Sequence, residues 1–131
     1  MRIATVVIMM LFLASCAIFG PPTELDDTKG MSADRIYALA SEKLADKDYE
    51  KAIGYLKKLE SRFPNGKYAA QAQLDMAYAY YKKEDAAQCV STVERFIKLH
   101  PNHPNLDYAY YLKGVEIGRA HVWTPVTDVS R

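Results

Sequence analysis

Hydrophobic residues between positions 33 and 115 recur at three- and four-residue spacing, the period of a helix with one buried face. Four polar or proline-containing breaks divide this pattern into five segments, which predict five helices. The breaks fall at residues 46–48, 64–66, 83–85 and 100–101. Ser32 is placed to cap the first predicted helix, and the fifth is expected to start near Asn105 and to end near Val115, where the periodicity stops.

The helical segments repeat at a fixed distance. Pro64 and Pro101 both follow the second helix of a predicted pair, both precede Asn, and lie 37 residues apart. The same shift pairs small residues with small ones and large apolar residues with large ones. Small residues are expected where the two helices of a pair approach closely, and large apolar residues where one pair stacks on the next. The matched sets are Ala40 with Ala77 and Gly114, Ala52 with Cys89, Leu39 with Met76, Leu56 with Val93, and Leu59 with Phe96.

This helix-pair pattern resembles the tetratricopeptide repeat, whose period is about 34 residues. The first repeat matches the family at Ile36, Leu39, Ala40, Tyr49, Ala52, Leu56 and Pro64. It departs at Lys43, where an aromatic residue is usual, and at Lys47, where glycine is common. The resemblance implies an all-α fold, a tetratricopeptide-repeat α-solenoid of antiparallel helix pairs with two full repeats and the start of a third. A plain helical bundle is the alternative.

In this repeat family the first helix of each pair lines the concave, ligand-facing surface. Carried onto this chain, the resemblance implies a partner- or peptide-binding face, beginning near Asp34, made of Tyr37, Ser41, Gln71, Leu74, Tyr78, Tyr81, Tyr108 and Tyr111. The repeat shift places Tyr37, Leu74 and Tyr111 in one row. Tyrosine rings give rigid contact area, and their hydroxyls hydrogen-bond to an exposed peptide backbone. Packing of several of these tyrosines between repeats is the alternative.

The N-terminus has the features of a lipoprotein signal peptide. A cationic start and an apolar run ending at Leu13 are too short for a membrane span, which needs about 20 residues. The run ends Leu13-Ala14-Ser15-Cys16, which resembles the lipobox of bacterial lipoproteins. That resemblance implies removal of residues 1–15, a diacylglycerol and an N-acyl chain on Cys16, and, with no Asp at position 17, sorting to the outer membrane. A chance cysteine is the alternative. Residues 16–32 then form the acylated cysteine and a flexible tether.

Composition and charge limit the kinds of partner, cofactor and chemistry that we expect of this protein. Seventeen Lys+Arg against 16 Asp+Glu give no basic field, so we expect no nucleic-acid partner. His100 and His103 lack further ligands at helical spacing, so we expect no metal and no cofactor apart from the lipid on Cys16. Without a catalytic motif, an enzyme is not expected. Cys89 is predicted to be a buried packing residue, and the charged pairs, such as Asp26-Asp27 and Lys57-Lys58, are predicted to be solvated.

A closer resemblance lies in residues 62–68, 73–82 and 95–108, which are similar to the BamD family, the lipoprotein subunits of the β-barrel assembly machinery. It implies a lipid-anchored scaffold on the periplasmic side of the outer membrane. Its partners would be the barrel-forming protein and other subunits, and extended segments of unfolded outer-membrane proteins. Members have about five repeats, so the resemblance covers an N-terminal portion. The alternatives are a periplasmic repeat adaptor of another envelope system, of the cell-division or Tol–Pal type, and an envelope enzyme with appended repeats.

Residues 116–131 are predicted to be a non-family tail. They show no helical periodicity and contain Trp123, the only tryptophan. The run from Glu116 to Thr127 resembles the translation of a common sequencing-adapter oligonucleotide, read in a frame where the Trp123 codon replaces a stop. We therefore interpret the tail as a sequencing artefact, and expect the third repeat to lack its second helix and to leave an apolar face uncovered.

Overall fold

The computed structural model describes residues 27–123, with side chains up to residue 120. Predictions for residues 1–26 and 124–131, including acylation of Cys16, lie outside the described residues. Five helices make up this part, and it contains no strand. They are α2 (Ala33–Ala45), α3 (Tyr49–Arg62), α4 (Ala69–Lys82), α5 (Ala86–Leu99) and α6 (Leu106–Trp123). The prediction of an all-α fold is confirmed.

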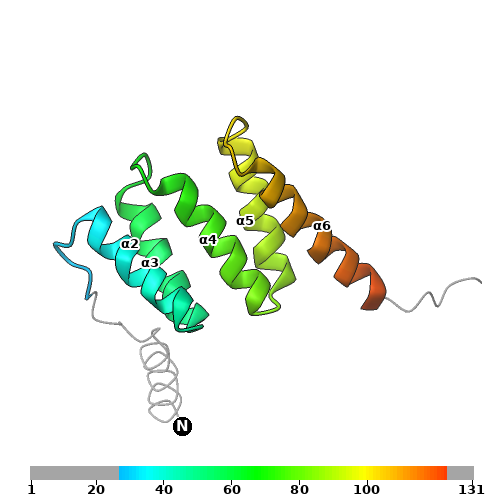
Figure 1. Ribbon diagram of the computed structural model, residues 1–131, viewed down its shortest axis with the longest axis horizontal. Coiled ribbons are helices and arrows are strands. Elements are labelled where there is room, and N and C mark those ends of the chain that lie inside the picture. The colour runs from blue at the N-terminus through cyan, green and yellow to red at the C-terminus, as the bar shows by residue number, and fades with distance from the viewer. Residues whose placement is uncertain (1–26, 124–131) are drawn as a thin grey trace, which may run out of the picture.

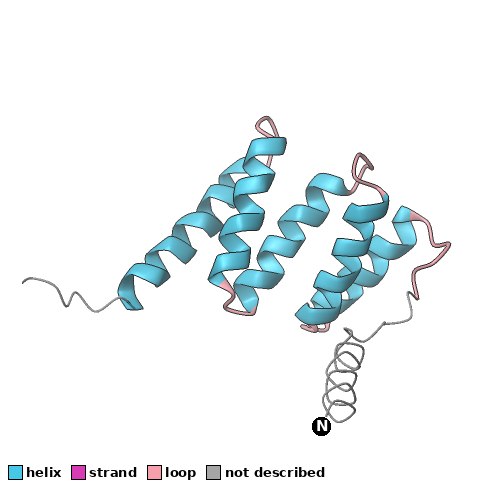
Figure 2. Cartoon of the chain, turned by 180° about the vertical axis from the view of Figure 1, so that it is seen from behind, coloured by secondary structure: helices cyan, strands magenta, loops and turns pink. Residues whose placement is uncertain are grey.

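The helices form antiparallel pairs that stack side by side (Figure 1). Helix α2 packs on α3 and α4 on α5, while α3 joins α4 and α5 joins α6 across the boundaries between pairs. Helix α4 also contacts α6, so the first helix of one pair lies next to the first helix of the following pair. Figure 2 shows the same stack from behind. We call the surface formed by α2, α4 and α6 the first-helix face.

The turns inside the two pairs repeat to the level of single hydrogen bonds. Lys47 and Glu84, 37 residues apart, both adopt left-handed backbone, with φ of 62° and 60°. The residue after each caps the following helix: the side chain of Asp48 accepts from the Lys51 N–H, and that of Asp85 from the Gln88 N–H. The position where the repeat family favours glycine thus keeps its left-handed geometry here without one.

The turns that follow α3 and α5 repeat as well. Phe63 and His100 have nearly identical dihedral angles, φ of −129° and −128°, and each N–H donates four residues back. Gly66 and His103 then occupy equivalent places: the N–H of Gly66 donates to the Phe63 carbonyl at 3.0 Å, and that of His103 to the His100 carbonyl at 3.1 Å. The ring of His103 packs edge-on against Phe96. His100 and His103 therefore build a turn between repeats.

The core runs between the two helix layers. Three of the matched sets are buried in both pairs: Ala52 with Cys89, Leu56 with Val93, and Leu59 with Phe96. In the fourth, Met76 is buried and Leu39 is half-buried. Small residues lie where the helices of a pair approach, since Ala40 and Ala77 are fully buried. These positions confirm the repeat and the tetratricopeptide-type packing.

The end predicted for the fifth helix is wrong. Helix α6 continues past Val115 to Trp123. The helix continues although apolar and polar residues alternate around it without a consistent apolar face. Backbone hydrogen bonding propagates easily once a helix has started, so a segment without amphipathic periodicity can still be helical.

Candidate functional site

A hydrogen-bonded cluster on the first-helix face joins α2 to α4 around Asp75. The hydroxyl of Tyr37 on α2 donates to Asp75 Oδ2 at 2.9 Å, and the amide nitrogen of Gln71, one turn before Asp75, donates to Oδ1 at 2.7 Å. Ser41 Oγ donates to the Tyr37 carbonyl at 3.0 Å. Three of the predicted face residues, Tyr37, Ser41 and Gln71, are therefore brought together, but largely to hold one repeat against the next.

Tyr68 extends this cluster toward the start of α2. Its ring stacks on Tyr37 with the ring centroids 4.3 Å apart and the planes at 11°. Its hydroxyl donates to Asp34 Oδ1 at 2.8 Å, and Lys67 Nζ lies 2.6 Å from the same oxygen. The hydrogen bonds from Lys67 and Tyr68 lower the pKa of Asp34, which stays ionised. The edge of the face beside α2 thus combines an aromatic stack with a solvated ion pair.

The electrostatics of the cluster follow from burial. Removal from water raises the pKa of Tyr37 to about 12, helped by the negative charge of Asp75. Burial also raises the pKa of Asp75, while the hydrogen bonds from Gln71 and Tyr37 oppose that shift. Tyr37 is therefore a neutral donor at neutral pH. The cluster is held together by hydrogen bonds among its polar groups.

The tyrosines of α4 and α6 are more accessible. Tyr78 is half-buried and meets the Tyr49 ring edge-on at 6.4 Å between centroids. Tyr81 is also half-buried. Tyr108 and Tyr111 lie one turn apart on α6 with their rings nearly parallel, and Tyr111 is 60% exposed. The most open part of the predicted face is therefore on α6.

Leu74 does not belong to an accessible face. It is 2% exposed and lies in the hydrophobic core, so the predicted row of Tyr37, Leu74 and Tyr111 is interrupted. The repeat shift explains why. The residues 37 positions after Tyr37 and Asp75 are Leu74 and Leu112, and both are buried. The contact between α4 and α6 therefore has leucines where the contact between α2 and α4 has a hydrogen-bonded polar pair. Leu74 is a packing residue.

Sequence reasoning missed Tyr68 and Asp75. Tyr68 precedes α4 and lies outside the helical pattern from which the face was assigned. Asp75 carried a usable signal: it is four residues after Gln71 on the same helix, and one repeat plus one residue after Tyr37. A buried tyrosine hydroxyl requires a partner, and an acid at that offset would have supplied it.

Other chemistry is sparse in residues 27–123. Their His, Cys, Asp and Glu side chains form no group of three or more placed to hold a metal ion. Cys89 is buried and free, and burial raises the pKa of its thiol to about 11, as fits the predicted packing role. Within the same range, no helix is long and apolar enough to cross a membrane.

Comparison with known proteins places the chain in a family. The profile of the YfiO family, described as an outer membrane lipoprotein, matches residues 29–128. The outer membrane protein assembly factor BamD of Neisseria gonorrhoeae is 41% identical over 115 residues, which cover 87% of this chain and 43% of that protein. BamD of Vibrio cholerae is 37% identical over 103 residues, covering 79% and 43%. BamD of Haemophilus influenzae is 32% identical over 107 residues, covering 82% and 41%.

The chain spans less than half the length of these relatives. The matches confirm the resemblance to BamD that residues 62–68, 73–82 and 95–108 indicated. Since the family profile covers most of this sequence, the chain belongs to the YfiO family of outer membrane lipoproteins.

Proposed function

We propose that this chain is the N-terminal part of a lipid-anchored, periplasm-facing scaffold that takes part in outer-membrane protein assembly. Its partners would be subunits of the β-barrel assembly machinery, including the barrel-forming protein, and extended segments of unfolded outer-membrane proteins. The observation that carries the proposal is the similarity to BamD assembly factors across most of the chain. Those relatives are named as assembly factors, which supports a scaffold rather than an enzyme.

The first-helix face is the proposed binding surface, with Tyr108 and Tyr111 at its most accessible part. Exposed tyrosines bind extended peptides well because a rigid ring covers apolar area while the hydroxyl pairs with backbone groups. Burial raises the pKa of Tyr108, with a smaller contribution from neighbouring Tyr78. Tyr37, Ser41 and Gln71 would shape this surface by fixing α2 against α4.

Two neighbouring tyrosines of α6 give a matched test. Tyr111 is 60% exposed on the first-helix face, whereas Tyr110 is 55% exposed and lies at the position equivalent to the buried Ile36 and Gln73 of the complete pairs. Tyr111→Ser should weaken binding of an extended C-terminal peptide of an outer-membrane protein by about tenfold, the effect of losing one aromatic anchor. Tyr110→Ser should leave the affinity unchanged. Fluorescence anisotropy measures both, and equal losses would contradict the proposed face.

The lipid anchor is tested separately. Cys16→Ala should release the chain from membranes into the soluble fraction, because no acyl chains could be attached. Copurification of tagged full-length protein from detergent-solubilised membranes tests the assembly role: barrel-assembly subunits should be recovered with it. Persistent membrane attachment of the alanine variant would contradict the anchor, and absence of those subunits would contradict the assembly role.

A further inference from the structure

The segment before α2 is folded onto the outer side of α3. Thr28, Lys29, Gly30 and Met31 form a turn in which the Met31 N–H donates to the Thr28 carbonyl at 3.0 Å. Gly30 has a φ of 81°, which the third position of such a turn requires and which glycine adopts without strain. This part of the predicted tether is therefore a defined turn that leads into the Ser32 cap.

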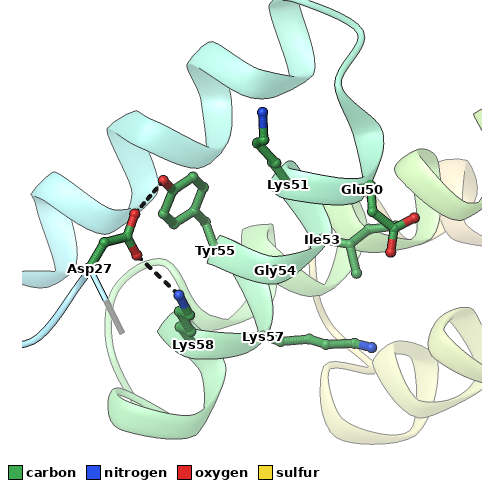
Figure 3. Close-up of a pocket in the computed structure, with 8 residues that line it drawn as sticks. All are labelled: Asp27, Glu50, Lys51, Ile53, Gly54, Tyr55, Lys57 and Lys58. Carbon is green, nitrogen blue, oxygen red and sulfur yellow. Dashed lines mark hydrogen bonds and ion pairs between the residues drawn. The ribbon is translucent and has the colours of Figure 1, made fainter. Parts of the chain in front are cut away.

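Three side chains of α3 hold this turn. Tyr55 donates to Asp27 Oδ2 at 2.7 Å, and Lys58 Nζ lies 3.1 Å from Asp27 Oδ1 (Figure 3). Arg62 donates to the backbone carbonyl of Thr28, and the Thr28 side chain is fully buried. A hydroxyl, an ammonium and a guanidinium on successive turns of α3 thus contact two consecutive residues. The contacts to Asp27 are exposed, whereas the contact between Arg62 and Thr28 is partly buried.

The held segment lies on the side of α3 that faces away from the first-helix face. Helix α3 belongs to the second layer of the stack, and Asp27 borders a hollow of about 430 Å³ on its exposed side (Figure 3). The hollow is bordered by Lys51, Lys57 and Lys58 against Asp27 and Glu50. Its charge is therefore slightly positive, which suits the negative surface of a membrane containing anionic lipid.

The contact at Asp27 limits how far Cys16 can lie from the repeats. Ten residues separate Cys16 from Asp27, and they span at most about 35 Å. If the chain were free up to Ala33, sixteen residues would span about 55 Å. The difference is close to the length of α3, about 21 Å for its 14 residues. Holding Asp27 therefore shortens the reach of the lipid-linked chain by about the length of α3 and fixes the point on the repeats from which it starts.

We propose that residues 27–31 and the Tyr55, Lys58 and Arg62 side chains form a clamp that fixes where the lipid-linked chain leaves the repeats. The clamp turns the outer side of α3 toward the membrane and leaves the first-helix face directed away from it, open to partners. The orientation rests on the proposed lipid anchor on Cys16, whereas the clamp itself does not.

Trypsin cleavage after Lys29 tests the clamp in the full chain, because cleavage at this exposed residue needs the turn to open. Tyr55→Phe removes only the hydroxyl that donates to Asp27, and should speed cleavage after Lys29 about fivefold. Tyr110→Phe removes a hydroxyl from an exposed ring on α6 and should leave the rate unchanged. Cleavage after Lys98 in α5 reports whether the fold is intact and should match in all three proteins. An unchanged Lys29 rate in Tyr55→Phe would overturn the clamp.

Fluorescence quenching tests the orientation. Acylated full chain is bound to vesicles of phosphatidylethanolamine and phosphatidylglycerol that carry a headgroup quencher, with a fluorophore on Gly54→Cys or on Tyr111→Cys. A side chain at Gly54 meets no neighbouring atom, so the label fits there. The Gly54 label should be quenched more strongly than the Tyr111 label, and combining Tyr55→Phe with Arg62→Gln should abolish the difference.

Equal quenching of the two labels in the unaltered clamp would overturn the orientation. Flotation of the same vesicles separates this result from failure of the anchor. A chain that does not float would overturn both the lipid anchor and the membrane-facing role of α3, while the Lys29 measurement still decides whether the clamp exists.

Discussion

The two complete helix pairs and α6 share one repeat pattern but differ in how much of it is covered. Ile36 on α2 and Gln73 on α4 hold equivalent positions and are 0% and 4% exposed, whereas Tyr110 at the same position of α6 is 55% exposed. Ala40 and Ala77 are fully buried, and their counterpart Gly114 is exposed. The same positions are therefore core in the two complete pairs and accessible in α6. Each repeat depends on neighbours to bury its apolar side.

The largest expected effect comes from truncating this position in a complete pair. Ile36→Ala should lower the free energy of unfolding by about 2–5 kcal/mol, because it removes buried carbon and leaves a cavity. Tyr110→Ala, the matched change in α6, should alter it by no more than about 0.5 kcal/mol. Urea unfolding followed by circular dichroism measures both. If the two variants lost similar free energies of unfolding, Tyr110 would be as buried in solution as Ile36, and the difference between α6 and α2 would be wrong.

A second effect of opposite sign concerns Glu116. Its side chain is fully buried and its carboxylate oxygens accept no hydrogen bond, although Oε1 lies 3.4 Å from Arg119 Nη1. The equivalent position of α4 is Ala79, which is also fully buried. Glu116→Leu alone would leave Arg119 Nη1 buried without its ion-pair partner. Glu116→Leu combined with Arg119→Leu should therefore stabilise the chain by about 1–3 kcal/mol, because it replaces a buried charged pair with apolar side chains.

Glu94 provides the control for this change. It is exposed on α5 and paired with Lys113 at 2.8 Å, so Glu94→Leu should have little effect. A loss of stability in the variant that lacks both Glu116 and Arg119 would contradict the expectation. Glu116 is an acid where the repeat has a buried alanine, whereas the YfiO family profile continues through residue 128, so the proposal that residues 116–131 are foreign to the gene needs a direct test. Sequencing the native locus across this point tests it, and a natural reading frame that keeps these residues would refute it.

Gly114 gives a smaller effect. It is exposed in α6, and a methyl group added there would meet no neighbouring atom. Gly114→Ala should stabilise the chain by about 0.5–1 kcal/mol through helix propensity alone. The reverse change in a complete pair, Ala77→Gly, should destabilise it by at least that much, since Ala77 is also packed. Thermal melts compare the two. A destabilising Gly114→Ala would mean that something already packs against this side of α6.

The sequence was sufficient to predict the repeat and most helix boundaries. The 37-residue shift is carried by strong local signals: Asp48 and Asp85 as caps, Pro64 and Pro101 after the helices, and small residues at close approaches. Buried positions recur at the same 37-residue spacing, so the repeat also predicted most of the core. The end of α6 could not, because helical backbone continues beyond the residues whose periodicity marks a buried face.

The candidate site was harder to predict because the repeat is not exact. Assigning one face to every first helix treated Leu74 like Tyr37, although a leucine at that position packs against the next repeat and a tyrosine needs a polar partner. The clamp was missed for a different reason. Asp27 and Lys58 were predicted as solvated charges, and neither composition nor periodicity indicates that a turn before the first helix returns to α3.

The smallest expected effect is on the pH dependence of stability. It distinguishes the contact between α2 and α4, where Tyr37 meets Asp75, from the contact between α4 and α6, where Leu74 and Leu112 hold the equivalent positions. Asp75 has a raised pKa in the folded chain and an ordinary value near 3.8 when unfolded, so the folded state binds its proton more tightly. Stability contributed by this group is therefore present at low pH and is lost as pH rises above 3.8 through the folded pKa.

Asp75→Asn keeps an oxygen that can accept from Tyr37 and removes this dependence. Compared with the unaltered chain, the variant should gain thermal stability as pH rises through this window. Asp107→Asn, a change at an exposed acid of α6, should follow the unaltered chain. Melting temperatures measured between about pH 3 and pH 7 give the comparison. Because Leu74 and Leu112 replace the polar pair in the contact between α4 and α6, a pH dependence that survives in Asp75→Asn would have to arise outside both contacts.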